Sequence, residues 1–424
     1  MAKSLQAIRG MNDLQPEDTP VWRYVENIIR HTLDQYGFQE IRTPVVEPTQ
    51  LFQRSVGEHT DIVEKEMYTF NDRSNESLTL RPEFTAGIVR AGIEHGLFYN
   101  QVRRLWTMGQ LFRYERPQKG RYRQFHQLSV EIFGLSEAEA DAELILLSAR
   151  LWKTFGIADK LTLELNTLGS SEERKAYREA LVNYCMQHKE ALDEDSRRRL
   201  ETNPLRILDS KDKTTRALLE NAPRLDQFLG HESQQYFEQI CTLLEENGIS
   251  YVINRQLVRG LDYYCQTVFE WTTDALGAQG TVCGGGRYDL LAEMLGGKPT
   301  PACGFGLGME RLILLILQIA SVPEQINRVA DVAMVAESSV RLYAIRLAEK
   351  IRDLAPEIRL LTSVKGSFKS QMKKADRSGA EMAFIVGQQE ADQQHITVKY
   401  LRKDLPQRIC NPEQAVFLAK ELLK

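Results

Sequence analysis

Apolar and polar positions alternate with two different periods along the chain. In residues 17 to 36 the apolar positions recur every three to four residues, the spacing of an amphipathic helix, and Gly37 is placed to end it. These apolar positions are Val21, Val25, Ile28, Ile29 and Leu33. The next stretch, "FQEIRTPVVEP", predicts a strand that enters a turn interrupted by proline.

Short alternating stretches follow. "KEMYTFND" and "SLTLRPE", joined by the polar "RSNES", predict a hairpin. A helix is expected near residues 85 to 96. "RRLWTMGQLFRYE" and "RQFHQLSVEIFG" then predict two strands on either side of a basic stretch, which is therefore expected to be the end of a second hairpin.

From residue 170 to about 247 the sequence becomes charged and favours helices, as in "SEERKAYREALVNYCMQHKEAL". Strand patterning returns at "SYVINRQLVRGLDYYCQTVFEWTT", and "CGFGLGMERLILLILQI" predicts a strand followed by an apolar helix. This order indicates a helical insertion in a mixed, mainly antiparallel sheet domain.

A linker is expected at Pro323 to Arg328, and beyond it short apolar strands alternate with helices, as in a small α/β domain. We therefore predict an α+β protein in four parts. Residues 1–169 and 248–325 would form the sheet domain, 170–247 the helical insertion and 330–424 the α/β domain.

Composition agrees with a globular protein of several domains. The chain has 424 residues, of which 42% are hydrophobic and 26% charged. Its six cysteines include no C-x-x-C pair and no leader is apparent, so a reducing cytoplasm is expected. The longest apolar run, around Leu312 to Ile319, is far shorter than the ~20 residues of a membrane span. No membrane segment is predicted.

Positive charge is concentrated in one place. Residues 103 to 123 hold seven Lys and Arg against a single acid, Glu115, although the whole chain has a net charge of -4. A confined site for a polyanion has this distribution. The alternative is a solvated charged loop.

Alternating glycines mark a second candidate site. Gly304, Gly306 and Gly308 would leave one face of a strand bare, so that a flat ring can lie on the backbone, and Arg311 would reach a phosphate. The alternative is close packing of a helix on the strand. A P-loop is excluded because Pro299 follows Gly297 and Lys298.

The segment "LVRGLDYYCQTVFEW" holds Arg259, Asp262, Tyr263 and Tyr264, which suit either a polar ligand or a buried hydrogen-bond network. The seven histidines show no H-x-x-x-H spacing, and no metal site is predicted. His126 is expected to be structural or to face the substrate.

Together these motifs resemble the class II aminoacyl-tRNA synthetases. The second motif of this class is similar to Phe112 to Glu115 with the basic loop up to Phe125. The third motif is similar to Gly304 to Arg311, and the proline of the first motif corresponds to Pro44. Within the class, "LVRGLDYY", "GGGRYD", "TLRPEFTAG" and "ERPQKGRYRQFHQL" resemble the histidyl-tRNA synthetase family of bacterial type, over essentially the whole chain.

The resemblance implies a class II catalytic domain, an anticodon-binding α/β domain and a homodimer. It implies that L-histidine reacts with ATP, accompanied by Mg²⁺, to give histidyl-adenylate and pyrophosphate, before the histidyl group passes to the 3′ end of tRNA(His). Two alternatives remain. One is the regulatory paralogue that assists histidine biosynthesis, which lacks the anticodon domain, and the other is a class II synthetase for proline, threonine or glycine.

Residue roles are carried over from the family motifs. Arg113 and Arg259 would be catalytic, binding the α-phosphate and the substrate carboxylate. The residues implied for ATP are Arg113, Glu115, Arg121, Phe125, Arg259, Gly308 and Arg311. Of these, Arg121 and Arg311 would bind the γ-phosphate, while Glu115 would contact the adenine edge.

The residues implied for histidine are Glu83, Thr85, Arg113, Gln127, Glu131, Arg259, Tyr263 and Tyr264. Glu83, Thr85 and Gln127 would bind the α-amino group. Glu131 and Tyr264 would bind the imidazole nitrogens, with Tyr263 nearby. Two positions depart from the bacterial pattern, which has glycine in place of Phe84 and often in place of Leu290.

Contacts with tRNA are expected at three places. The hairpin tip, Arg116 to Lys119, would meet the acceptor end, and the insertion would brace the acceptor arm. The α/β domain would bind the anticodon, with backbone phosphates contacted by Lys365, Lys369, Lys373 and Lys374.

Overall fold

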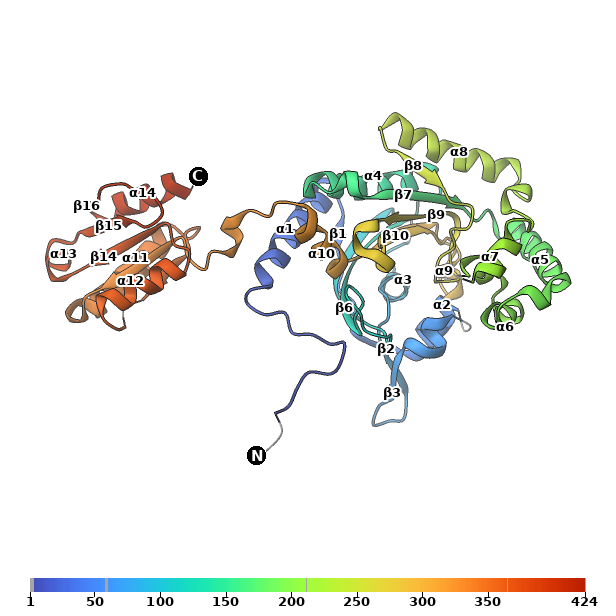
Figure 1. The fold of residues 1–424 in the computed structure, drawn as a ribbon, viewed down its shortest axis with the longest axis horizontal. Helices are drawn as coiled ribbons and strands as arrows, with labels where there is room; N and C mark the ends of the chain where they lie inside the picture. Colours follow the sequence, from blue (N-terminus) through green and yellow to red (C-terminus); the bar gives the residue numbers. More distant parts are fainter. Residues whose placement is uncertain (1–3, 58–59, 211, 364, 424) are drawn as a thin grey trace. The chain divides into compact units, whose positions relative to one another are not determined.

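The computed structural model describes residues 4–57, 60–210, 212–363 and 365–423 (Figure 1). The chain divides into two compact units, Met1–Gln15 with Trp22–Ser321 and Pro16–Val21 with Val322–Lys424. Where each predicted domain begins and ends stays a prediction.

An eight-stranded sheet forms the centre of the first unit, in the order β1-β5-β6-β11-β10-β9-β7-β8. Only the outer pairs, β1 with β5 and β7 with β8, are parallel. The strands are β1 (Gln39–Glu40), β5 (Arg103–Phe112), β6 (Gln124–Phe133), β7 (Thr162–Thr167), β8 (Tyr251–Ile253), β9 (Cys265–Thr272), β10 (Thr281–Arg287) and β11 (Ala302–Gly308). The predicted mixed, mainly antiparallel sheet is confirmed.

A smaller antiparallel sheet, in the order β2-β4-β3, precedes it in the chain. Its strands are β2 (Val46–Pro48), β3 (Tyr68–Asn71) and β4 (Ser77–Leu80), and the β3–β4 hairpin is the predicted one. The strand expected at "FQEIRTPVVEP" is shorter than predicted, because only Gln39–Glu40 and Val46–Pro48 are extended and they belong to different sheets. Pro44 lies between them and has no N–H to donate to a ladder.

Helices pack around the large sheet. Its central strand β11 contacts both α4 and α10, and α10 also contacts β6. The helices of this part are α1 (Thr19–Gln35), α2 (Thr49–Val56), the π-helical turn η1 (Ile62–Glu66), α3 (Thr85–Glu94), α4 (Ala138–Phe155), α9 (Leu291–Met294) and α10 (Met309–Ile319). Gly37 follows α1 with φ of 72°, as expected for a residue that ends a helix.

The segment between β7 and β8 is helical, as predicted (Figure 1). Its helices are α5 (Ser171–Gln187), α6 (Glu194–Thr202), α7 (Lys213–Leu219) and α8 (His231–Glu246). It has an apolar cluster of its own, built on Tyr177, Leu181 and Ile207. Helix α8 also packs on α4, where the Tyr236 hydroxyl donates to Asp141 Oδ2 at 2.5 Å.

Short 3-10 turns connect these elements. They are η2 (Ala158–Lys160), η3 (Lys189–Ala191), η4 (Pro204–Asp209), η5 (Leu225–Gln227), η6 (Asp274–Gln279), η7 (Glu324–Asn327) and η8 (Ser338–Val340). Turn η7 falls within the predicted linker.

The second unit contains a five-stranded sheet in the order β13-β12-β14-β15-β16. Strands β13, β12 and β14 are parallel, and the last two pair antiparallel. The elements are β12 (Val332–Ala336), α11 (Arg341–Leu354), β13 (Leu360–Thr362), α12 (Phe368–Arg377), β14 (Met382–Val386), α13 (Gln388–Gln393), β15 (Ile396–Tyr400), β16 (Arg408–Cys410) and α14 (Pro412–Leu423). The predicted small α/β part is confirmed.

Candidate active site

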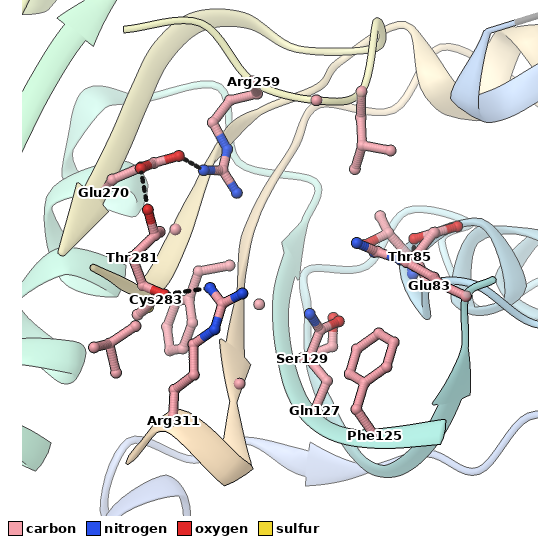
Figure 2. A pocket seen from close by; sticks show the side chains of 18 of the residues that line it. Glu83, Thr85, Phe125, Gln127, Ser129, Arg259, Glu270, Thr281, Cys283 and Arg311 are labelled. Atoms are coloured by element: carbon pink, nitrogen blue, oxygen red, sulfur yellow. Dashed lines mark hydrogen bonds and ion pairs between the residues drawn. The ribbon is translucent and has the colours of Figure 1, made fainter. Parts of the chain in front are cut away.

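A cavity of about 300 Å³ lies over the central strands β6, β9, β10 and β11 (Figure 2). The β5–β6 hairpin, the loop before β9 and the start of α3 complete its wall. Every residue implied above for ATP or histidine lines it, namely Glu83, Thr85, Arg113, Glu115, Arg121, Phe125, Gln127, Glu131, Arg259, Tyr263, Tyr264, Gly308 and Arg311. The fold brings them together, while their individual roles stay predictions.

Arg113 follows the last residue of β5 and is fixed by the hairpin. Its backbone N–H donates to Arg123 O at 2.9 Å, and its Nε donates to Pro82 O at 2.9 Å. The guanidinium carbon lies 5.3 Å from the centroid of the Phe125 ring. Burial lowers the pKa of Arg113, and the nearby carboxylate of Glu66 only partly offsets this effect. An anion in the cavity would stabilise the buried cation.

Arg259 reaches the cavity from the loop before β9 and forms an ion pair with Glu270 on that strand (Figure 2). The second carboxylate oxygen of Glu270 accepts a hydrogen bond from Thr281 Oγ1 at 2.9 Å. Burial by itself lowers the pKa of Arg259, but the charge of Glu270 and the contacts with Tyr264 and Tyr263 together outweigh burial, so the pKa is raised. Sequence reasoning missed Glu270, although it lies only 11 residues after Arg259 in the same segment, because the pairing of the two side chains is visible only in the fold.

Arg311 stands in the first turn of α10. Its Nε donates to Gly120 O at 3.1 Å and its Nη1 to Thr281 O at 2.6 Å. Burial lowers its pKa, and the positive charges of Arg121 and Arg113 lower it further. Like charges therefore crowd this part of the cavity, an arrangement that a polyanion would stabilise.

Glu115, expected at the adenine edge, forms an ion pair with Arg121. Both side chains come from the basic hairpin, so the acid within this stretch orients one of its own arginines. This contact disfavours the simple alternative of a solvated loop.

Two of the alternating glycines of β11 also make room for side chains of the cavity wall. Gly304 is paired with Glu131 on β6, and a Cβ at Gly304 would lie 1.6 Å from Glu131 Oε2. A Cβ at Gly306 would lie 2.9 Å from Gln127 Nε2. The space at these two positions is therefore taken by site side chains. Gly308, where a Cβ would have its nearest contact at 3.9 Å, leaves backbone open to a ligand.

Glu131 is the most enclosed carboxylate of the cavity, with 1% of its surface exposed. Its Oε1 accepts from Ser129 Oγ at 2.6 Å and from Thr85 Oγ1 at 2.8 Å, and its Oε2 accepts from the Tyr288 hydroxyl. Burial raises its pKa to about 7. Sequence reasoning missed Ser129 and Tyr288, although Tyr288 belongs to the "GGGRYD" signature.

Aromatic rings build the floor beside Glu131. Tyr263 and Tyr264 lie 4.7 Å apart by ring centroid, and Tyr288 lies 5.4 Å from Tyr263. Burial raises the pKa of all three phenols. They are therefore neutral hydrogen-bonding groups at physiological pH.

Glu83 is fixed at the start of α3. Its Oε2 accepts from Thr85 N at 2.6 Å and its Oε1 from Ala86 N at 2.9 Å, which satisfies two helix N–H groups. Burial raises its pKa. Phe84, between the two predicted contacts, is 1% exposed and packs under the Arg81 guanidinium at 4.5 Å. Its ring is not part of the cavity lining.

His126 and Glu310 join the hairpin to α10. Glu310 accepts from the backbone N of His126 at 2.9 Å and contacts its Nδ1 at 2.8 Å. The imidazole also meets the Trp22 ring edge on, with centroids 4.8 Å apart. His126 is therefore structural. The other departure from the family pattern, Leu290, is 40% exposed at the start of α9.

A comparison with known families decides the identity. The family model described as "Histidyl-tRNA synthetase" matches residues 10–312. The chain belongs to the histidyl-tRNA synthetase family. The model described as "Anticodon binding domain" matches residues 329–411, which include all five strands of the second sheet.

Solved structures agree with this membership. The apo histidyl-tRNA synthetase of S. aureus is 35% identical, with 98% of this chain and 100% of that chain covered and a TM-score of 0.82. The histidyl-tRNA synthetase of Nostoc sp. PCC 7120 is 19% identical, with 99% and 100% covered and a TM-score of 0.71. The latter likeness concerns the fold alone.

Proposed function

We propose that this chain is a histidine–tRNA ligase, which activates L-histidine with ATP and transfers it to the 3′ end of tRNA(His). The observation that carries the proposal is the convergence of Arg113, Arg259 and Arg311 from three separate segments on one cavity, which also holds the buried carboxylate of Glu131. Cations suit the polyphosphate, and the carboxylate suits an imidazole.

Activation joins a carboxylate to the α-phosphate of ATP, so the repulsion between two anions must be offset. Arg113 and Arg259 bind both groups and stabilise the charge that develops at the α-phosphate. Arg259 is positioned by its ion pair with Glu270, and Arg113 by its bond to the Pro82 carbonyl. Preorganised donors of this kind require no rearrangement as the reaction proceeds.

The remainder of ATP follows the hairpin and the start of α10. Arg121 and Arg311 bind the γ-phosphate, Glu115 contacts the adenine edge, and Phe125 and Gly308 contact the nucleoside. Among the described residues no group of three or more His, Cys, Asp or Glu side chains is arranged to hold a metal ion. Mg²⁺ would enter with ATP as part of the substrate, held mainly by phosphate oxygens.

Histidine lies against the acidic wall. Glu83, Thr85 and Gln127 bind its α-amino group, while Glu131 and Tyr264 bind its imidazole nitrogens, with Tyr263 alongside. Because these polar groups are buried, a ligand without matching partners leaves them unsatisfied. Sites of this type discriminate by ~10⁴ to 10⁵ without an editing step.

Each of the two units has its own contacts with tRNA. The hairpin tip, Arg116 to Lys119, meets the acceptor end. In the anticodon-binding domain, backbone phosphates of the tRNA are contacted by Lys365, Lys369, Lys373 and Lys374. A homodimer in the cytoplasm is the expected assembly and location. None of the helices in the described residues combines the length and apolar character needed to cross a bilayer.

The regulatory paralogue is disfavoured as an alternative. The paralogue is expected to lack an anticodon domain, whereas residues 329–411 of this chain match the anticodon-binding model. Arg113, Arg259 and Arg311 are also all present in the cavity.

Exchange of labelled pyrophosphate into ATP tests the proposal, because it measures adenylate formation without tRNA. We expect exchange with histidine and none with proline, threonine or glycine. Signal with one of these three and not with histidine would overturn the choice of amino acid, and no signal with any amino acid would favour the regulatory alternative.

A further inference from the structure

The helical segment between β7 and β8 contacts the loop that carries Arg259, Tyr263 and Tyr264. We call residues 254–264 the signature loop. It has turns but no helix or strand, so its conformation depends on bonds to other parts of the fold. Several of these bonds come from the helical insertion.

Arg174 on α5 makes the most direct one. Its Nη1 donates to the carbonyl oxygen of Tyr264, the last residue of the signature loop. A hydrogen bond from a guanidinium is stronger than one between neutral groups. Tyr264 is buried, with 6% of its surface exposed, so losing this donor is costly.

Gln266, two residues further on, has a φ of 46°, in the left-handed region that non-glycine residues rarely adopt. Its N–H donates to Gly169 O at 2.9 Å, and its carbonyl accepts from Leu168 N at 2.6 Å. Its Nε2 donates to Ser233 Oγ on α8 at 3.3 Å. A strained backbone conformation of this kind persists only where surrounding contacts fix it. For Gln266 these contacts come from the helical insertion and from the residues that lead into the insertion.

Glu173, next to Arg174, joins the two helices involved. Its carboxylate accepts from Ser170 N at 2.7 Å, Gly230 N at 2.6 Å and Ser233 Oγ at 2.7 Å. Helices α5 and α8 are thus tied together at the site where both contact residues 264–266.

A second contact lies further back in the signature loop. Asn203, after α6, donates from Nδ2 to Asp262 Oδ1 at 2.8 Å, and Asp262 N donates to Val56 O at 3.3 Å. Leu225 packs both in the apolar cluster of the insertion and in the cluster that contains Tyr263 and Tyr264.

We propose that the insertion is a positioning element of the histidine site, with Arg174 and Asn203 as positioning residues that fix the signature loop. This inference rests on the proposed function and assigns the insertion a role in activation besides the expected bracing of tRNA. Deleting residues 170–247 would remove both roles at once, so single substitutions are the sharper test.

The first test measures histidine-dependent pyrophosphate exchange in Arg174→Ala, Arg174→Lys and the control Arg178→Ala, which removes an exposed arginine one turn along the same helix. We expect KM for histidine to rise about tenfold in Arg174→Ala, with KM for ATP within about twofold. Arg174→Lys, which keeps a cationic donor, should recover part of the loss, and Arg178→Ala should match the wild type.

A role confined to stability would instead lower the thermal midpoint without moving KM for histidine. That result, or equal rises of the two KM values, would overturn the inference. If the wild type shows no dependence on histidine, the proposed function fails. If it does and Arg174→Ala behaves like Arg178→Ala, only the positioning role fails.

The second test compares Asn203→Ala with Asn203→Asp and uses the exposed Asn221→Asp of the same insertion as control. Aspartate has the shape of asparagine but places a second carboxylate against Asp262. KM for histidine should therefore rise more in Asn203→Asp than in Asn203→Ala, and not in Asn221→Asp. The same KM for histidine in both Asn203 variants and in the wild type would contradict a positioning role for Asn203.

Discussion

The two groups of charged side chains in the cavity are prepared for their ligands in opposite ways. Arg113, Arg121 and Arg311 are crowded cations. Burial lowers the pKa of Arg113 and Arg311, and neighbouring arginines lower both further. Glu83 and Glu131 are enclosed carboxylates that already accept hydrogen bonds from hydroxyl and backbone groups. The cationic group needs an anion to become stable, whereas the carboxylate group is fixed in geometry before any ligand arrives.

Under the proposed function, this difference suits one cavity to two substrates. A crowded set of cations attracts any polyphosphate and gains most as negative charge builds up, so it contributes mainly to rate. A rigid, buried set of acceptors tolerates few ligands, so it contributes mainly to the choice of amino acid. Substitutions in the first group should therefore act on the maximal rate, and those in the second on KM for histidine.

The largest effect is expected for Arg259→Lys, a substitution of the cavity arginine that is paired with Glu270 and also faces the reacting phosphate in the proposed function. Lysine keeps the charge but loses the planar fork that contacts two acceptors at once. We expect the maximal rate of pyrophosphate exchange to fall by ~10²- to 10³-fold, with the thermal midpoint changed little because the ion pair with Glu270 can still form. A loss smaller than about threefold would mean that Arg259 does not act on the reacting phosphate.

Gly304→Ala should act on the carboxylate group. The added methyl would lie 1.6 Å from Glu131 Oε2 and 2.7 Å from Val130 O, so Glu131 must move. We expect KM for histidine to rise at least about tenfold, and overpacking to cost about 1 to 3 kcal/mol in urea unfolding.

Gly308→Ala is the matched control, since its methyl would be 3.9 Å from the nearest side chain. It should raise KM for ATP and leave KM for histidine unchanged. If Gly304→Ala instead raised KM for ATP and Gly308→Ala raised KM for histidine, the proposed difference between the two groups would be contradicted.

Glu131→Gln tests the charge of the carboxylate group. Because burial raises the pKa of Glu131 to about 7, the folded protein holds an extra proton between pH ~4.5 and ~7. The stability that this proton gives is present below pH ~4.5 and lost as the pH rises through 7. Because glutamine does not titrate, the Glu131→Gln variant does not lose this stability as the pH rises.

Glu131→Gln should therefore gain stability relative to the wild type as the pH rises from 5 to 8, by up to roughly 3 kcal/mol. Urea unfolding at several pH values measures the difference. KM for histidine in the wild type should also rise below pH 7, where the acceptor is protonated. A stability difference independent of pH would show that Glu131 keeps an ordinary pKa.

The smallest effect on exchange is expected for Phe84→Ala. The ring is buried against Arg81 and does not line the cavity. The substitution should cost about 3 to 5 kcal/mol of stability, measured by urea unfolding, while KM for histidine changes less than about threefold. A large rise in KM with unchanged stability would place Phe84 in the binding site.

Much of this site follows from the sequence because its residues lie in short motifs. The alternation in residues 103–133 predicts the hairpin that places Arg113, and family motifs supply the residues of the cavity wall. Ser129 lies two residues before Glu131 on the same face of β6, so strand alternation could have found it. Tyr288 was missed because its partner, Glu131, is brought to it by strand pairing and packing rather than by local spacing. The same holds for Gly304, whose missing side chain makes room for Glu131 across the ladder.

The insertion shows the same limit more clearly. Its helices are predictable from composition, but no local pattern indicates that Arg174 bonds to the carbonyl of Tyr264. A contact between residues so far apart in the chain depends on how the insertion leaves β7 and packs beside the loop before β9. Only the folded arrangement reveals it.

A crystal structure with histidine and a non-reactive ATP analogue tests the central claim most directly. We predict the triphosphate between Arg113, Arg259 and Arg311, the nucleoside beside Gly308, and the imidazole within hydrogen-bond distance of Glu131. A triphosphate bound away from these three arginines, or an imidazole that does not contact Glu131, would contradict the account.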